Sequence, residues 1–154
     1  MLRQGFVSVP GDCPTWAAGG LRFSCLRCGG CCSGEPGYVW VSEEECRQIS
    51  DYFGMPFDAF TCRHVRRAGQ RLSLLEKRNG DCEFLERDES GKSGCLIHAV
   101  RPSQCRTWPF WRSNLKSARS WEQAARHCPG INQGQLWSPE SVAAALRETN
   151  DLPL

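Results

Sequence analysis

The spacing of hydrophobic and polar positions changes several times along the chain, and in the first half these changes predict short elements. Residues 38–41 (Tyr-Val-Trp-Val) are β-branched or aromatic, which predicts a short strand. Ser42 follows directly, and Glu45 stands three residues later, so the two form a capping box at the start of a helix. Apolar side chains at helical spacing extend this helix to about Phe53, and a second short helix is predicted over residues 56–63.

Turn signals dominate the pattern in the second half of the chain. Residues 71–77 alternate weakly, and Asn79-Gly80 is a strong hairpin signal, so residues 81–85 are predicted to return as the partner strand. The pattern then predicts a short strand over 95–97, a helical turn over 102–106, and helices over 116–128 and from Ser138 to about residue 148. These elements together predict a small irregular α+β fold with a short antiparallel sheet and three or four helices.

The apolar residues in the N-terminal part of the chain show neither helical nor strand periodicity. Residues 1–22 contain many chain breakers, so we expect an irregular N-terminal arm, followed by a single domain over residues 23–154. Within that domain, residues 23–34 (FSCLRCGGCCSG) contain three Gly and cannot form a stable helix. We expect this segment to be a loop of consecutive tight turns.

The composition provides few large apolar residues for a hydrophobic core. Of the 154 residues, 30 are Leu, Ile, Val or Phe, just under the roughly 20% at which a self-sufficient core becomes doubtful. Disorder usually explains such a composition, but disorder goes with high net charge, and here the net charge is only +2. Eleven Cys residues make disulfides or metal the candidates for the missing stabilisation.

The expected compartment decides between disulfides and metal. Residues 1–24 contain no apolar stretch of about 7–15 residues as in a secretory signal, and no run approaches the ~20 apolar residues of a membrane span. We therefore expect a cytoplasmic protein without membrane association, in which thiols stay reduced and Cys clusters bind metal. The odd number of Cys residues also fits a disulfide framework poorly.

Four cysteines form a C-x2-C-x2-C-C motif: Cys25, Cys28, Cys31 and Cys32. A C-x2-C turn folds the backbone over one point and places two sulfurs within reach of one metal ion. Three such cysteines in a row supply three thiolates on one side of a centre, as in the ligand loops of many iron–sulfur sites. The side chains of Cys31 and Cys32 diverge, so we expect Cys32 to serve a second site, to bridge, or to remain a spare thiol.

Four more cysteines lie downstream, each beside a predicted turn or element end: Cys82, Cys95, Cys105 and Cys128. With the loop they could make two four-thiolate sites, or one cluster with spectators. Cys128 has no local partner, so it either binds metal together with remote cysteines, with its sulfur within roughly 7 Å of two other Cys sulfurs, or is an inert core thiol. His98 has ligand-like spacing from Cys95, but we expect it to pack or to form hydrogen bonds rather than bind metal.

Several blocks of the sequence resemble one family, the CxxCxxCC cysteine-cluster proteins, whose name refers to zinc or iron chelation. The blocks are Phe23–Cys32, residues 82–85 (CEFL), the run from Cys95 to Phe110, and residues 128–131 (CPGI) followed by Gly134. The resemblance implies metal ligation by Cys25, Cys28, Cys31, Cys32, Cys82, Cys95, Cys105 and Cys128. It leaves three cysteines outside its pattern: Cys13, Cys46 and Cys62.

The resemblance leaves the metal open between Zn²⁺ and an iron–sulfur cluster such as [4Fe–4S], and the C-x2-C-x2-C loop favours iron–sulfur. The flagellin lysine N-methylase is similar in its cysteine motif, so a component of a protein-lysine N-methylase-like enzyme is a minor alternative. The chain contains no nucleophile–base pair, phosphate loop or paired carboxylates of recognisable spacing. We therefore expect a metal-binding protein for electron transfer, redox sensing or metal handling, organised around Cys-ligated metal, rather than an enzyme on its own.

Charge is unevenly distributed along the chain. Residues 63–78 and 101–126 each contain six Lys or Arg and one Glu, and the second stretch also contains several Trp. A basic surface with aromatic side chains can bind single-stranded nucleic acid, but we expect this role less than stabilisation of nearby thiolates by Arg101 and Arg106. The second hypothesis is a structural zinc module that binds a protein or nucleic-acid partner through a basic Trp-rich face.

Overall fold

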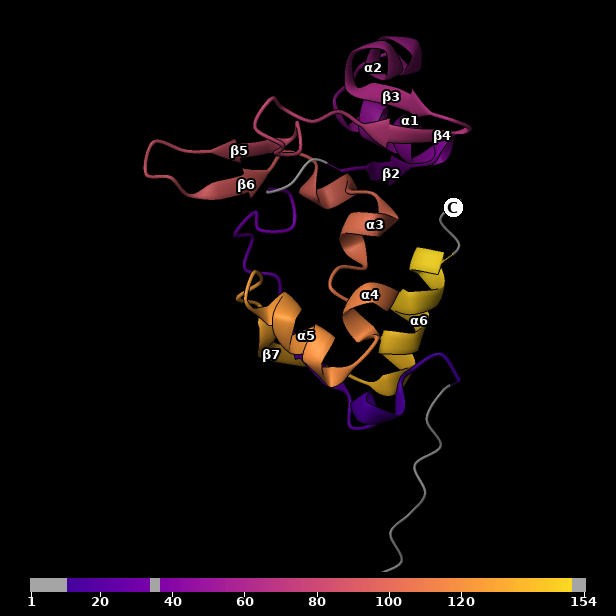
Figure 1. The fold of residues 1–154 in the computed structure, drawn as a ribbon. Helices are drawn as coiled ribbons and strands as arrows, with labels where there is room; N and C mark the ends of the chain where they lie inside the picture. Colours follow the sequence, from indigo (N-terminus) through magenta and orange to yellow (C-terminus); the bar gives the residue numbers. More distant parts are fainter. Residues whose placement is uncertain (1–10, 34–36, 151–154) are drawn as a thin grey trace, which may run out of the picture.

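The computed structural model describes residues 11–33 and 37–150, and it places two groups of helices and short strands on either side of a central segment (Figure 1). The expected small α+β fold with antiparallel pairing is confirmed. The described residues form three small sheets rather than one, and six α-helices, two of which are single turns of four residues. No helix among these residues is long and apolar enough to cross a membrane.

The upper group in Figure 1 combines a three-stranded sheet with two helices. The strand order is β2 (Val39–Val41), β4 (Arg71–Leu74) and β3 (Val65–Ala68), with both neighbouring pairs antiparallel. Helices α1 (Glu43–Tyr52) and α2 (Phe57–His64) pack with this sheet. The buried side chains form the upper cluster: Val41, Cys46, Ile49, Phe60, Leu74, Cys82, Phe84, Leu85 and Ile97.

The lower group brings together the two ends of the described chain. Strand β1 (Leu21–Phe23) pairs antiparallel with β7 (Ile131–Trp137). Helices α4 (Arg112–Leu115), α5 (Ala118–Ala125) and α6 (Pro139–Asn150) complete this group. Its buried side chains form the lower cluster: Cys13, Ala17, Leu21, Phe23, Phe110, Leu115, Trp121, Ala124, Cys128, Ile131, Val142, Ala143, Ala145 and Leu146.

Residues 11–22, which belong to the expected N-terminal arm, contribute to the lower cluster. Thr15–Ala17 form a 3-10 turn, η1, and Ala17 is buried. Leu21 is also buried and begins β1 opposite Trp137. The local pattern does not reveal this strand, because it has only three residues and its partner lies far along the chain. The rest of the expected arm lies outside the described residues.

The hairpin predicted between residues 71–77 and 81–85 forms only in part. Both edges of β4 are already occupied, one by β2 and one by β3, so no edge remains for a full return strand. Past the end of β4, one isolated bridge joins Glu76 to Cys82. The turn signal between these residues was correct, but the predicted length of the return strand was wrong.

A separate hairpin, β5 (Leu85–Arg87) with β6 (Ser93–Cys95), projects to the left of the upper group in Figure 1. β6 ends where the strand over 95–97 was expected, because the chain turns there toward the 3-10 helix η2 (His98–Val100). The single-turn helix α3 (Ser103–Arg106) then lies between the upper and lower groups. The run from Cys95 to Phe110 therefore connects the upper group to the lower group.

Candidate metal centre

The loop after β1 carries four cysteines and fits closely between two other parts of the chain. Gly29 has φ +77°, in the left-handed region, and a Cβ there would lie 2.8 Å from the Leu85 side chain of β5. A Cβ on Gly30 would lie 2.7 Å from the backbone oxygen of His127. The two glycines therefore allow the loop to pass between the β5–β6 hairpin and the turn that leads to Cys128.

Backbone N–H groups of this loop donate to its own sulfurs. The N–H of Arg27 donates to Cys25 Sγ at 3.4 Å, and the N–H of Gly30 donates to Cys28 Sγ at 3.4 Å. The expected loop of turns without a helix is observed over the described residues 24–33. Each C-x2-C turn thus supplies a donor that stabilises negative charge on sulfur, as hydrogen bonds do around metal-bound thiolates.

Three of the downstream cysteines come from the upper group and from α3. Cys82 follows the turn after β4, and its N–H donates to the carbonyl of Cys32 at 2.6 Å. Cys95 ends β6 and is half-buried, and Cys105 lies in α3. The Cys82–Cys32 contact joins the loop to the upper cluster.

Cys128 comes from the lower group. Helix α5 ends at Ala125 rather than reaching residue 128 as predicted, and the chain leaves it in a turn in which the Cys128 N–H donates to the Ala124 carbonyl at 3.1 Å. The thiol of Cys128 is buried, and its Sγ accepts the indole N–H of Trp108 at 3.5 Å. Proximity of this sulfur to two others, within the distance stated above, stays a prediction.

A cavity of about 280 Å³ lies where these segments meet. The three other cysteines are elsewhere: Cys13 is in the lower cluster, Cys46 is in the upper cluster, and Cys62 is exposed on α2. All eleven cysteines are free thiols. The cavity is lined by all eight cysteines of the motif blocks: Cys25, Cys28, Cys31, Cys32, Cys82, Cys95, Cys105 and Cys128.

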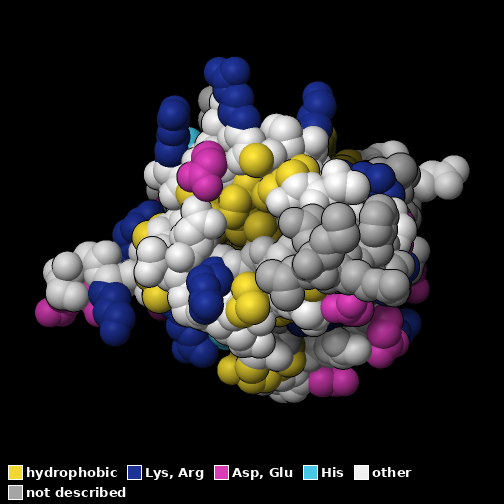
Figure 2. All heavy atoms as spheres, turned by 90° about the horizontal axis from the view of Figure 1, so that it is seen from below, with side chains coloured by type: hydrophobic (Ala, Val, Ile, Leu, Met, Phe, Trp, Pro, Cys, Tyr) yellow, Lys and Arg dark blue, Asp and Glu magenta, His cyan; other side chains and the backbone are white. Residues whose placement is uncertain are grey.

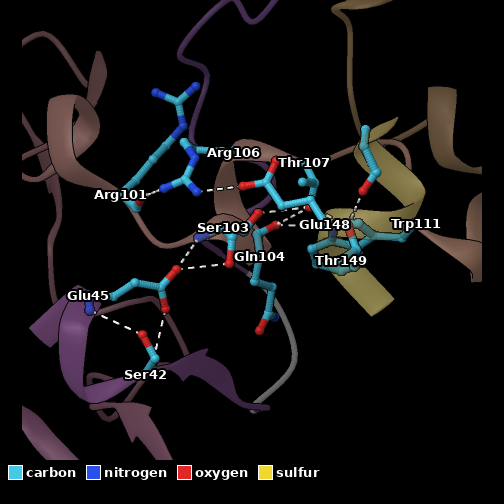
Figure 3. Close-up of polar contacts among 11 residues, drawn as sticks. Ser42, Glu45, Arg101, Ser103, Gln104, Arg106, Thr107, Trp111, Glu148 and Thr149 are labelled. Atoms are coloured by element: carbon cyan, nitrogen blue, oxygen red, sulfur yellow. Dashed lines mark hydrogen bonds and ion pairs between the residues drawn. The ribbon is translucent and has the colours of Figure 1, made fainter. Parts of the chain in front are cut away.

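Helix α3, which carries Cys105, is held at its N-terminal end by α1 (Figure 3). One carboxylate oxygen of Glu45 accepts the N–H of Ser103 at 2.7 Å and its hydroxyl at 2.8 Å. The other oxygen accepts the Ser42 N–H at 2.9 Å, and the Ser42 hydroxyl accepts the Glu45 N–H, so the predicted capping box is confirmed. The contact with Ser103 was not foreseen, because nothing in the local pattern connects α1 with α3.

The other end of α3 contacts α6. The hydroxyls of Thr107 and Thr149 lie 2.6 Å apart, and Arg106 forms an ion pair with Glu148 at 2.5 Å (Figure 3). Helix α3 is thus attached to both groups of elements. These contacts position Cys105 on the cavity between them.

We expect Glu45→Ala to lower the free energy of unfolding by about 1–3 kcal/mol, since it leaves donors of half-buried Ser42 and buried Ser103 without their acceptor. Chemical denaturation of the two proteins measures this difference. Glu44→Ala is the matched control, because Glu44 is exposed in the same helical turn, and its effect should stay within about 0.5 kcal/mol. Equal effects of the two substitutions would show that neither the capping box nor the Ser103 contact contributes to stability.

Burial raises the pKa of the thiols on the inner side of the cavity. Desolvation is the main cause for Cys82, Cys95 and Cys105, and neighbouring cavity thiols raise each pKa further. For Cys105 these neighbours are Cys82, Cys31 and Cys95, in that order. Thiols from the loop, β6 and α3 therefore influence one another electrostatically, as expected for groups around a shared space.

Cys31 and Cys32 form a hydrogen-bonded pair of thiols. The expected divergence of their side chains was wrong, because their sulfurs lie 3.8 Å apart in a hydrogen bond. This hydrogen bond from Cys32 lowers the pKa of Cys31 to about 7, with a smaller contribution from Arg101. The same hydrogen bond and burial raise the pKa of Cys32. One thiolate of the pair is therefore stabilised near neutral pH, which is the form that binds metal.

The family model of CxxCxxCC domains, described as a "putative zinc- or iron-chelating domain", matches residues 24–129. The chain belongs to the CxxCxxCC family. The matched segment contains all eight cysteines that line the cavity. No solved structure matches the chain.

The donors around the cavity of this CxxCxxCC protein fit zinc or iron. Thiolates select soft or borderline metals, and no Asp or Glu belongs to the described residues that line the cavity, so the site does not suit Mg²⁺ or Ca²⁺. Within residues 11–33 and 37–150, no three Cys, His, Asp or Glu side chains already stand close enough to hold one ion. The thiols surround the space, and ligation by each of the eight stays a prediction.

His98 also lines the cavity, but its ring faces an arginine. Both ring nitrogens lie within 3.0 Å of Arg101 Nη1, which also donates to the His98 carbonyl at 2.8 Å. Burial lowers the pKa of His98, and the charges of Arg101 and Arg27 lower it further, so the ring is neutral near pH 7. This contact agrees with the expected hydrogen-bonding role.

Of the Trp side chains of the expected basic face, Trp121 is buried, and Trp108 and Trp111 are half-buried. Trp121 is 2% exposed, and its indole N–H donates to Asn132 at 2.9 Å. The indole N–H of Trp111 donates to the Gln104 carbonyl at 3.0 Å. Figure 2 shows Lys and Arg side chains projecting separately around the lower face, with apolar side chains exposed between them. Trp121 therefore belongs to the core and offers no ring for stacking on a nucleic acid.

Proposed function

We propose that this CxxCxxCC protein holds an iron–sulfur cluster in the thiol-lined cavity and acts in electron transfer or redox sensing. The observation that carries the proposal is that eight thiols line one cavity of about 280 Å³. A tetrahedral Zn²⁺ takes four ligands at about 2.3 Å and leaves no space between them. The cavity has the volume of several water molecules at about 30 Å³ each, which suits a centre larger than a single ion.

The chain supplies an outer and an inner set of thiols. Cys25, Cys28 and Cys31 are exposed on the loop, whereas Cys82 and Cys128 are buried. An iron–sulfur cluster supplies reversible electron transfer when bound, and the exposed loop would leave a short path from it to a partner protein. Metal handling is the alternative role, in which the same exposed thiols exchange metal with a partner. Either role requires a reducing compartment such as the cytoplasm, because the ligand thiols must stay reduced.

Anaerobic purification followed by elemental analysis tests this proposal. We expect brown protein with visible absorption, and iron and acid-labile sulfide in similar amounts. Colourless protein that contains only zinc would overturn the iron–sulfur assignment and leave metal binding intact. Protein without any bound metal would overturn both.

A further inference from the structure

Arginine side chains line the cavity together with the thiols, and their contacts show which of them can stabilise a metal–thiolate centre. The described residues that line the cavity include Arg27, Arg101 and Arg106 and no carboxylate side chain. Four thiolates around Zn²⁺ or an iron–sulfur cluster leave the centre with net negative charge, and buried negative charge is costly unless a cation lies near it. An arginine that lines the cavity and has no carboxylate partner would therefore increase the affinity of the site for metal.

Two of the three arginines do not offer an uncompensated charge to the thiols. Arg106 forms an ion pair with Glu148 at 2.5 Å and donates to the Arg101 carbonyl at 3.0 Å, so its charge is compensated toward α6 (Figure 3). Arg27 is exposed on the cysteine loop, where solvent and salt screen its charge. Arg101 is the remaining candidate.

Arg101 is half-buried and held in place. Its Nη1 donates to the His98 carbonyl at 2.8 Å and contacts the neutral ring of the same residue. Among the described residues, it forms no ion pair with a carboxylate. It lines the cavity together with Cys31 of the loop, Cys95 of β6 and Cys105 of α3. This one side chain thus shares the cavity with thiols from three separate segments.

We propose that Arg101 is the counter-ion of the metal–thiolate centre, a positioning residue whose charge stabilises the thiolates from three segments at once and slows loss of the metal. This inference rests on the proposed metal binding but not on the choice between iron–sulfur and zinc. Hydrogen-bonding and charged groups beside metal ligands typically change metal affinity by about 10–100-fold when removed. Cys31, Cys95 and Cys105 are the thiols on which the loss of this charge should act.

The test compares metal release to excess chelator from four metal-loaded full-length proteins: wild type, Arg101→Gln, Arg101→Lys and Arg119→Gln. Arg119 is exposed on α5 away from the cavity, so its substitution changes the net charge equally without removing the counter-ion. We expect Arg101→Gln to release metal about tenfold faster than wild type, and the other two to stay within about threefold. High salt should accelerate release from wild type more than from Arg101→Gln, because it screens the charge of Arg101.

The outcomes separate this inference from the proposed function. If wild type retains metal and Arg101→Gln releases it as slowly as Arg119→Gln, the counter-ion role is overturned while metal binding stands. Release from Arg101→Lys as fast as from Arg101→Gln would also overturn it, because charge alone should suffice at this position. If Arg101→Gln does not fold, the salt dependence of metal release from wild type decides, because a release rate that salt leaves unchanged would overturn the counter-ion role. Wild type without bound metal would overturn the proposed function itself.

Discussion

Removal of the metal is expected to abolish the cooperative unfolding transition of this protein. Cys82 belongs to the upper cluster and Cys128 to the lower cluster, and both line the cavity between them. Metal bound to thiols from both sides would join two small cores that have little apolar material of their own. Structural metal sites contribute on the order of 10 kcal/mol in small domains, comparable to the whole stability of an ordinary domain.

Near-ultraviolet circular dichroism and thermal unfolding, recorded before and after anaerobic chelation, measure this effect. Trp108 and Trp137 line the cavity, so the fixed environment of these rings and their dichroism should disappear with the metal. Return of the transition after metal is added back is the control against irreversible damage. An apoprotein that unfolds like the metal-bound form would show that the two clusters are stable without this link.

Substitution of a cysteine in the loop is expected to lower bound metal to near nothing. Cys28 is exposed, lines the cavity, and its sulfur accepts the Gly30 N–H. Serine has a hard oxygen that binds zinc or iron far more weakly than a thiolate, so Cys28→Ser removes a ligand with little change in volume. The same result is expected for Cys25→Ser and Cys31→Ser, with metal per chain measured by elemental analysis after anaerobic purification.

Cys62→Ser and Cys46→Ser provide the controls for this series. Cys62 is exposed on α2, and Cys46 is fully buried in the upper cluster, where burial raises the pKa of its thiol to about 11. Neither lines the cavity, so both variants should keep their metal, although Cys46→Ser places a hydroxyl in an apolar cluster and should lower stability. Loss of as much metal from Cys46→Ser as from Cys28→Ser would contradict the division of the cysteines into two sets.

The correct predictions from the sequence concern neighbours along the chain. The capping box of Ser42 and Glu45 depends on residues three positions apart, and both of its hydrogen bonds are present. The turns of the cysteine loop depend on its glycines, and α6 begins at Pro139 as expected. Each of these features is decided by backbone conformation and hydrogen bonds within one or two turns, which the sequence contains directly.

The errors arose where a strand or helix depends on a distant partner. The return strand after Asn79-Gly80 is short because β2 and β3 occupy both edges of β4, and β1 exists only because β7 pairs with it. Neither condition appears in the local pattern of apolar positions. Hydrogen bonding across a sheet satisfies backbone groups from remote segments, so tertiary packing decides which short stretches become strands.

By itself, the sequence determined the local turns, because spacing and residue type are local properties, and it determined the family, whose resemblance implied the eight candidate thiols. The tertiary structure alone decided that all eight line one cavity, with Gly30 against His127 bringing the loop to the turn before Cys128. It also decided that Glu45 holds α3 through Ser103 and that Trp121 is buried in the core. These contacts join residues far apart in the chain, so no local pattern of residues reveals them.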